Sequence, residues 1–214
     1  MRAFSFLRTS LIISVFSLAL GCQKERADLS SIQEQGNATE LQARLNKMPV
    51  TRAYRDSFEI DLNFKPDLAG GWTMADPDAP AWFYGTGNGN ATHMGNVATY
   101  FNTHTLRSAA GIVMVYDAPV NMFYAAPLQQ YNVPTDVSVV HYDGKGNSIW
   151  FRATTEGLTS WHTAATDVAM EGKMVIVGGT GKFVGATGET NFHAEFNQLN
   201  LFDATMWQTG KIRY

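Results

Sequence analysis

The sequence predicts an all-β fold for residues 52–214, an antiparallel closed barrel of about eight strands. Three observations favour this fold class. Apolar and polar residues alternate with the period of a strand, turn residues separate the alternating segments, and no segment after residue 50 keeps a helical period. Many strands without helices between them are typical of sandwiches and barrels, and closure leaves no unpaired strand edge.

The segment SFEIDLNF, residues 57–64, is the clearest predicted strand. The apolar side chains on one of its faces are Phe58, Ile60, Leu62 and Phe64. Polar and acidic residues alternate with them, so the opposite face is expected to meet water. Two shorter apolar runs follow in GIVMVYDAPVNMFYAAP, residues 111–127, and residues 117–119 separate them.

A hairpin is predicted in DVSVVHYDGKGNSIWFRATTEG, residues 136–157. The pairs DG and GN at 143–144 and 146–147 suit a tight turn, and Val139 and His141 share one face of the first strand. Another strand is expected in GKMVIVGG, residues 172–179. The segments TNFHAEFNQLNLF, residues 190–202, and WQTGKIRY, residues 207–214, are expected to form the last strand pair.

Residues 1–21 have the pattern of a secretory signal peptide. Arg2 and Arg8 form a basic start, and the apolar run from Leu11 to Leu20 is too short to span a bilayer. LALGC resembles the lipobox of bacterial lipoproteins, which implies that Cys22 is lipidated after cleavage and anchors the chain to the membrane. We therefore expect a lipid-anchored protein of the bacterial cell envelope, at the outer membrane. The alternative is ordinary cleavage, which would leave a secreted soluble protein.

Residues 22–51 are predicted to be a polar tether, because apolar positions are sparse in them. Removal of residues 1–21 leaves 14 basic and 19 acidic residues, a net charge of −5. An acidic chain without a basic patch is not expected to bind nucleic acid. Because Cys22 is the only cysteine, the fold must rely on a packed core rather than on disulfides.

The stretch VIVGGTGKFVGATGE, residues 175–189, has the glycine content of a nucleotide-binding loop. A dinucleotide site needs a helix after its glycines, whereas two further glycines fall where that helix would run, each costing about 1 kcal/mol relative to alanine. We interpret the stretch as a connection between strands, without a cofactor. Its predicted structural residues, with the phenylalanine in the core, are Gly178, Gly179, Gly181, Phe183 and Gly188.

The same stretch carries a family resemblance. VGGTGKFVGATGE, residues 177–189, resembles the signature of the allene oxide cyclase and dirigent type of calycin-like β-barrel. GTGNGNATHMGNVATY, residues 85–100, is similar to a pattern of the bacterial members through Gly87, Gly89, His93 and Gly95, and TGKIRY resembles their closing strand. The resemblance covers residues 52–214 and implies a barrel and, from the plant members, a homotrimer. The catalytic residues of the plant enzymes do not carry over to positions in this chain.

Few residues outside these motifs indicate a site. The five histidines form no H-x-H or H-x-x-x-H pair, so no metal site is predicted. The candidate ligand-binding residues are His93, in the glycine motif, and Arg152 and Glu156, which share the parity of one predicted strand. If that face points inward, the last two form a polar pocket, and if it points outward they belong to a solvated face.

Two function classes stay open. Abundant aromatic residues could line a barrel that holds one small apolar ligand, or could fill its interior in a structural role. In either case the protein is non-catalytic. The alternative is an isomerase, a cyclase or a stereochemistry-directing protein like the plant relatives. An open interior with convergent polar groups would favour the enzyme.

Overall fold

The computed structural model describes residues 48–67, 80–107, 113–197 and 199–214. The chain from Pro49 to Tyr214 forms one compact unit built on an antiparallel sheet, which confirms the predicted all-β class. The strands are β1 (Thr51–Pro66), β2 (Ala81–Ala91), β3 (Gly95–Arg107), β4 (Val113–Asp117), β5 (Val139–Tyr142), β6 (Ser148–His162), β7 (Asp167–Thr180), β8 (Thr187–Asn197) and β9 (Asn200–Arg213). The predicted signal peptide, Cys22 and the tether up to residue 47 lie outside the described residues.

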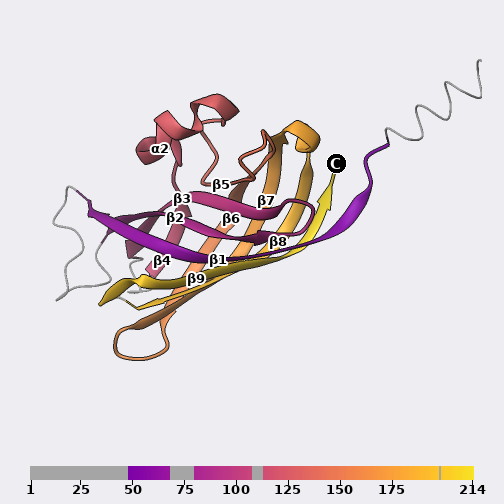
Figure 1. The fold of residues 1–214 in the computed structure, drawn as a ribbon. Coiled ribbons are helices and arrows are strands. Elements are labelled where there is room, and N and C mark those ends of the chain that lie inside the picture. Colours follow the sequence, from indigo (N-terminus) through magenta and orange to yellow (C-terminus); the bar gives the residue numbers. More distant parts are fainter. Residues whose placement is uncertain (1–47, 68–79, 108–112, 198) are drawn as a thin grey trace, which may run out of the picture. The chain divides into compact units, whose positions relative to one another are not determined.

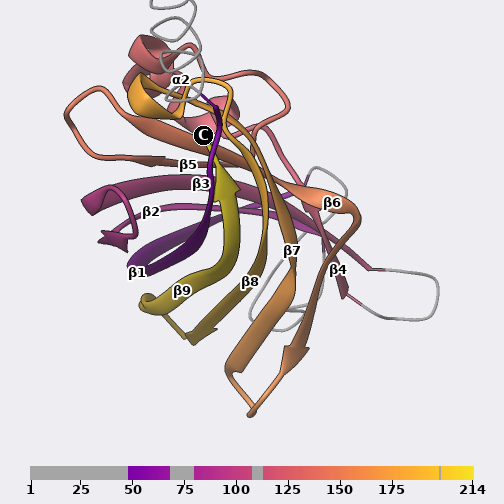
Figure 2. The same ribbon diagram turned by 90° about the vertical axis from the view of Figure 1, so that its right-hand side faces the viewer.

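The sheet closes on itself. Its order is β2-β1-β9-β8-β7-β6-β4-β3-β5, with further pairings of β2 with β3 and of β6 with β5. Both β4 and β5 lie between β3 and β6 and pair with different parts of them, so these two short strands together fill one position of the ring. Figure 2 shows β1, β9, β8, β7 and β6 following one another around the ring. The ring therefore has the eight strand positions that the sequence predicts.

The chain between β4 and β5 leaves the ring. It forms the helix α2 (Asn121–Leu128) and the 3₁₀ turn η1 (Gln129–Tyr131), where the sequence indicated only an apolar run. Figure 1 shows α2 outside the sheet, near β3 and β5. Side chains of this excursion bury the outer face of the neighbouring strands in a second apolar cluster, which includes Leu128, Tyr131 and Val140. Both faces of the sheet are therefore apolar at this place.

The predicted strand and hairpins appear with shifted ends. Burial alternates along β1 from Tyr54 to Leu62, so the period-two face begins three residues before the predicted segment. The hairpin of β5 and β6 turns at residues 143–147, as the DG and GN pairs predict. The last pair is β8 and β9, and its turn falls inside the predicted segment 190–202 instead of after it.

The inward side chains form one continuous core. Within it, one group of buried polar residues lies toward the end of the ring where β1 begins and β9 ends, and an apolar cavity lies further along the same strands. These two features are the candidates for function. None of the helices in the described residues is long and apolar enough to span a membrane.

Candidate functional site

Three connections close the end of the ring near the carboxyl terminus. The 3₁₀ turn η2 (Gly181–Phe183) joins β7 to β8, and the Lys182 backbone N–H donates to Oδ1 of Asn147 in the β5–β6 turn at 3.0 Å. The Lys182 ammonium donates to the carbonyl oxygen of His93 in the β2–β3 turn. The glycine stretch thus links three turns at one end of the ring.

The glycines of this connection meet steric limits. Gly181 has a φ of +60°, and a Cβ there would lie 2.2 Å from Oδ1 of Asn147. A Cβ on Gly179 would lie 2.1 Å from the carbonyl oxygen of Ser148. Phe183 is fully buried, and its ring centroid lies 4.8 Å from that of Tyr214. The stretch connects β7 to β8, and its Phe183 side chain fills the core at this end of the ring. Its glycines allow the backbones to approach closely.

The three candidate ligand-binding residues do not share a pocket. His93 has a φ of 70°, and its Nε2 lies 2.9 Å from the carbonyl oxygen of Ala53, so its ring ties the β2–β3 turn to β1. Arg152 is exposed and donates to Asp136 Oδ2 at 2.7 Å. Glu156 is also exposed. The last two therefore lie on the solvated outer face, which was one of the two arrangements open from the sequence.

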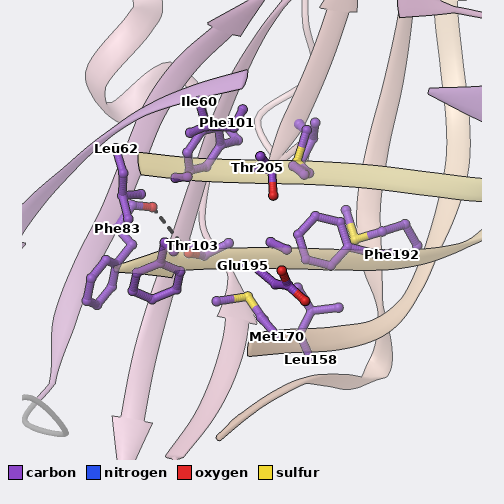
Figure 3. Close-up of a pocket in the computed structure, with 16 residues that line it drawn as sticks. Ile60, Leu62, Phe83, Phe101, Thr103, Leu158, Met170, Phe192, Glu195 and Thr205 are labelled. Carbon is purple, nitrogen blue, oxygen red and sulfur yellow. Dashed lines mark hydrogen bonds between the residues drawn. The ribbon is translucent and has the colours of Figure 1, made fainter. Parts of the chain in front are cut away.

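A cavity lies inside the ring, between side chains from every strand except β4. About 50 Å³ of it is open to the centre of a water-sized sphere, whereas one water molecule needs about 10–15 Å³ in such a measure. Figure 3 shows Phe101, Phe192 and Leu158 bordering this space from different strands. Three methionines also line it and are Met170, Met174 and Met206. Because methionine side chains are unbranched and flexible, the cavity can adapt to a guest.

Of the three polar residues of the lining, two have partners and the third is exposed. The Thr103 hydroxyl donates to the carbonyl oxygen of Phe83 at 3.2 Å, the contact dashed in Figure 3. Glu195 has an exposed carboxylate, 3.1 Å from Nε2 of His193. The third polar residue, Thr205, is exposed on β9. The cavity itself is therefore an apolar space.

A polar cluster crosses the ring interior beyond the cavity. Tyr54 and Asp56 point inward from β1, and His141 points inward from β5, which is not a neighbour of β1 in the ring. The Tyr54 hydroxyl lies 3.0 Å from His141 Nδ1, and Asp56 Oδ2 lies 3.4 Å from the same nitrogen. The backbone N–H of Gln208 donates to Asp56 Oδ1 at 2.7 Å, and the Thr190 hydroxyl donates to Gln208 Oε1 at 2.6 Å.

Burial keeps this cluster neutral. It raises the pKa of Asp56 to about 8 and outweighs the lowering effects of the Tyr54 hydroxyl and the Gln208 N–H. It lowers the pKa of His141 to about 3, because the charged imidazolium is costly away from water. Burial, followed by the nearby Asp56 charge, raises the pKa of Tyr54 well above its ordinary value. Near pH 7 the cluster therefore holds a protonated carboxyl and a neutral imidazole.

Four side-chain atoms of this region are buried without a hydrogen-bond partner in the protein: Asp56 Oδ2, Thr99 Oγ1, His141 Nε2 and Gln208 Nε2. Thr99 and His141 are directly opposite each other in the β3–β5 pair, and Asp56 and Gln208 are opposite each other in the β1–β9 pair. Residues opposite each other share a face of the sheet. The unpaired atoms therefore belong to the wall of the same interior space.

Sequence reasoning missed this cluster, although one signal for it was present. Tyr54 and Asp56 have the same parity as Phe58 and Ile60, so an inward acidic residue could have been read from an alternation extended by two positions. His141 was placed on the face of Val139, and both are buried. The meeting of β1 and β5 across the ring carries no local sequence signal.

Within the described residues, no group of three or more histidine, cysteine, aspartate or glutamate side chains is arranged to hold a metal ion. The resemblance to the allene oxide cyclase and dirigent family stays a prediction. Comparison with protein-family models, curated protein sequences and solved structures finds no match to this chain.

Proposed function

We propose that this protein is a lipid-anchored protein of the bacterial envelope whose barrel binds a small apolar molecule and performs no chemistry. The observation that supports binding is the apolar cavity inside the ring. Apolar cavities stay dry and accept small apolar molecules, because burying the guest removes apolar surface from water, and at about 50 Å³ this one needs its side chains to move before a ring-sized guest fits. The flexible methionines widen the range of guests that fit.

Two features favour binding over catalysis. The Thr103 hydroxyl is occupied by a backbone carbonyl, so it does not offer a reactive group to the cavity. In the cluster, a protonated Asp56 is no base, and His141 with a pKa of about 3 is a poor proton acceptor at neutral pH. The isomerase or cyclase alternative would need the reacting molecule beside Asp56, whose pKa of about 8 lies near neutral pH, and Asp56 does not line the cavity.

The cavity can be tested with toluene. The protein is labelled with ¹³C at its methionine methyl groups and titrated with toluene. The Met170, Met174 and Met206 signals in the NMR spectrum should shift, because all three residues line the cavity. Ala204→Leu places a larger side chain in the lining and should abolish the shifts. Ala53→Leu is the matched control, because Ala53 is exposed on β1. Toluene shifts that survive in Ala204→Leu would place the ligand elsewhere and contradict the proposal.

The anchor is a separate part of the proposal. Wild-type protein from its host should partition into the detergent phase and carry a mass increment on Cys22, whereas Cys22→Ala should partition into the aqueous phase. Equal partitioning of the two would refute lipidation. The homotrimer expected from the family resemblance is tested by sedimentation velocity on the Cys22→Ala protein, and a purely monomeric species would refute it.

A further inference from the structure

The buried polar cluster lies one inward position away from the apolar cavity on three strands. On β9 the lining residue Met206 is followed two residues later by Gln208, and on β5 the lining residue Val139 is followed by His141. On β3 Thr99 precedes the lining residue Phe101 in the same way. Two residues along a strand span about 7 Å on one face. The polar cluster and the apolar cavity therefore occupy neighbouring levels of the ring interior.

The side chain between the two levels on β1 is Phe58. It is buried, lies between Asp56 and the lining residue Ile60 in the inward series, and its ring centroid is 4.5 Å from that of His141. Because this ring packs against His141, contact between a guest in the cavity and the polar level requires the ring to move.

The polar groups left without partners suit an oxygen acceptor. Gln208 Nε2 is a donor in every state, and its Oε1 is held by Thr190. When Tyr54 donates to His141 Nδ1, the ring proton lies on Nε2, which is then a second donor. The Thr99 hydroxyl can donate as well. Buried polar groups are normally hydrogen-bonded, so the two unpaired ones on neighbouring strands, Thr99 and His141, indicate a partner.

We propose that the interior site takes a small apolar molecule carrying one neutral oxygen acceptor, a ketone, ether or alcohol, whose oxygen accepts hydrogen bonds from His141 and Thr99, which lie directly opposite each other in the β3–β5 pair. This inference rests on the proposed binding function and names the chemistry of its ligand. The head must be neutral, because an ionised head would lose its hydration in a wall that offers no opposite charge. The apolar body occupies the cavity lined by Met206 and Phe101.

The test compares two probes of the same shape, cyclohexanone and methylenecyclohexane, in which an oxygen atom replaces a CH₂ group. The protein is the full mature chain with Cys22→Ala, so that no detergent competes for the probes. The expected result is that cyclohexanone binds and shifts both the cavity methionine signals and the ¹⁵Nε2 signal of His141. Methylenecyclohexane should shift the methionine signals alone.

Thr99→Val separates the head contact from the fit of the cavity. It removes one donor while keeping a β-branched side chain, and it should weaken cyclohexanone binding about fivefold, the equivalent of one hydrogen bond, with methylenecyclohexane unchanged. Thr209→Val, on the exposed face of β9, is the matched control and should change neither affinity.

The outcomes distinguish the two proposals. If neither these probes nor toluene shifts the methionine signals, the proposed binding function fails and this inference fails with it. If methylenecyclohexane binds and cyclohexanone leaves His141 Nε2 unshifted, or if Thr99→Val affects both probes equally, the oxygen-acceptor site is overturned while the apolar cavity stands.

Discussion

Replacing Asp56 by asparagine should change how the stability of the protein depends on pH. Asp56 has a folded pKa of about 8 against an ordinary 3.8, and His141 has a folded pKa of about 3 against an ordinary 6.5. Between pH 3.8 and 6.5 the pair binds one proton in both states, on the carboxyl when folded and on the imidazole when unfolded. The pair therefore adds no pH dependence to stability in this interval.

Above pH 6.5 the unfolded pair has lost its last proton, while folded Asp56 keeps one until about pH 8. The folded state binds more protons, so stability should fall as the pH rises. At 1.36 kcal/mol for each pH unit, the loss between pH 6.5 and 8 is about 2 kcal/mol. For a domain of this size that lowers Tm by about 4–8 °C.

Asp56→Asn keeps an oxygen that accepts the Gln208 backbone N–H and has no proton to lose. Its stability should be flat from pH 6.5 to 8. Below pH 6.5 only the His141 difference of the pair remains, so the variant should lose stability with acid relative to the wild type. The assay is urea unfolding followed by tryptophan fluorescence from pH 4.5 to 8.5. Asp61→Asn, on the exposed face of β1, is the control and should keep the wild-type profile.

The reasoning would be refuted by a wild-type profile without a fall between pH 6.5 and 8. It would equally be refuted if Asp56→Asn kept that fall, because another group would then be its source.

Further predictions concern Phe183 and the turn η2. Phe183→Ala should cost about 3–5 kcal/mol in urea unfolding, since the ring is fully buried, whereas Val184→Ala next to it should cost under 0.5 kcal/mol because Val184 is exposed. Gly181→Ala should cost about 1–3 kcal/mol, because it combines a positive φ with a clash against Asn147. A loss for Val184→Ala equal to that for Phe183→Ala, or none for Gly181→Ala, would contradict the structure of the connection.

The sequence could predict the sheet because local patterns record which face of a strand is buried. The alternation around Phe58 and the turn pairs after Tyr142 are local signals, and both appear in the structure. Rejection of the nucleotide loop also rested on local chemistry, since glycines beyond Phe183 could not continue a helix. The chain there returns as β8 instead.

The helix α2 could not be predicted in this way. Its residues form an apolar run that includes Pro127, and Tyr124 departs from helical geometry in its middle, so the segment has no clear helical period. It forms where the chain must cross outside the ring between β4 and β5, and burial of Leu128 against the sheet supports it. This is a tertiary cause, and a short apolar run alone fits either a strand or a helix.

The polar cluster could not be predicted from the sequence either, and the reason is similar. Asp56 and His141 lie 85 residues apart, and they meet only because β1 and β5 face each other across a closed ring. A single aspartate within an alternating strand is normally assigned to its solvated face. The ring reverses that expectation by burying the inward face of β1 from Tyr54 to Leu62.

The unpaired hydroxyl of Thr99 allows a test of whether this residue has a structural role or a role in ligand binding. A buried hydroxyl without a partner costs about 1–3 kcal/mol, and a barrel selected for stability alone would carry valine in place of Thr99. Thr99→Val should therefore raise the unfolding free energy by about 1 kcal/mol while it weakens binding of the oxygenated probe. A structural hydroxyl would give the opposite, a less stable protein with unchanged binding. Opposite signs for stability and affinity in this one variant are the result that a ligand-binding interior requires.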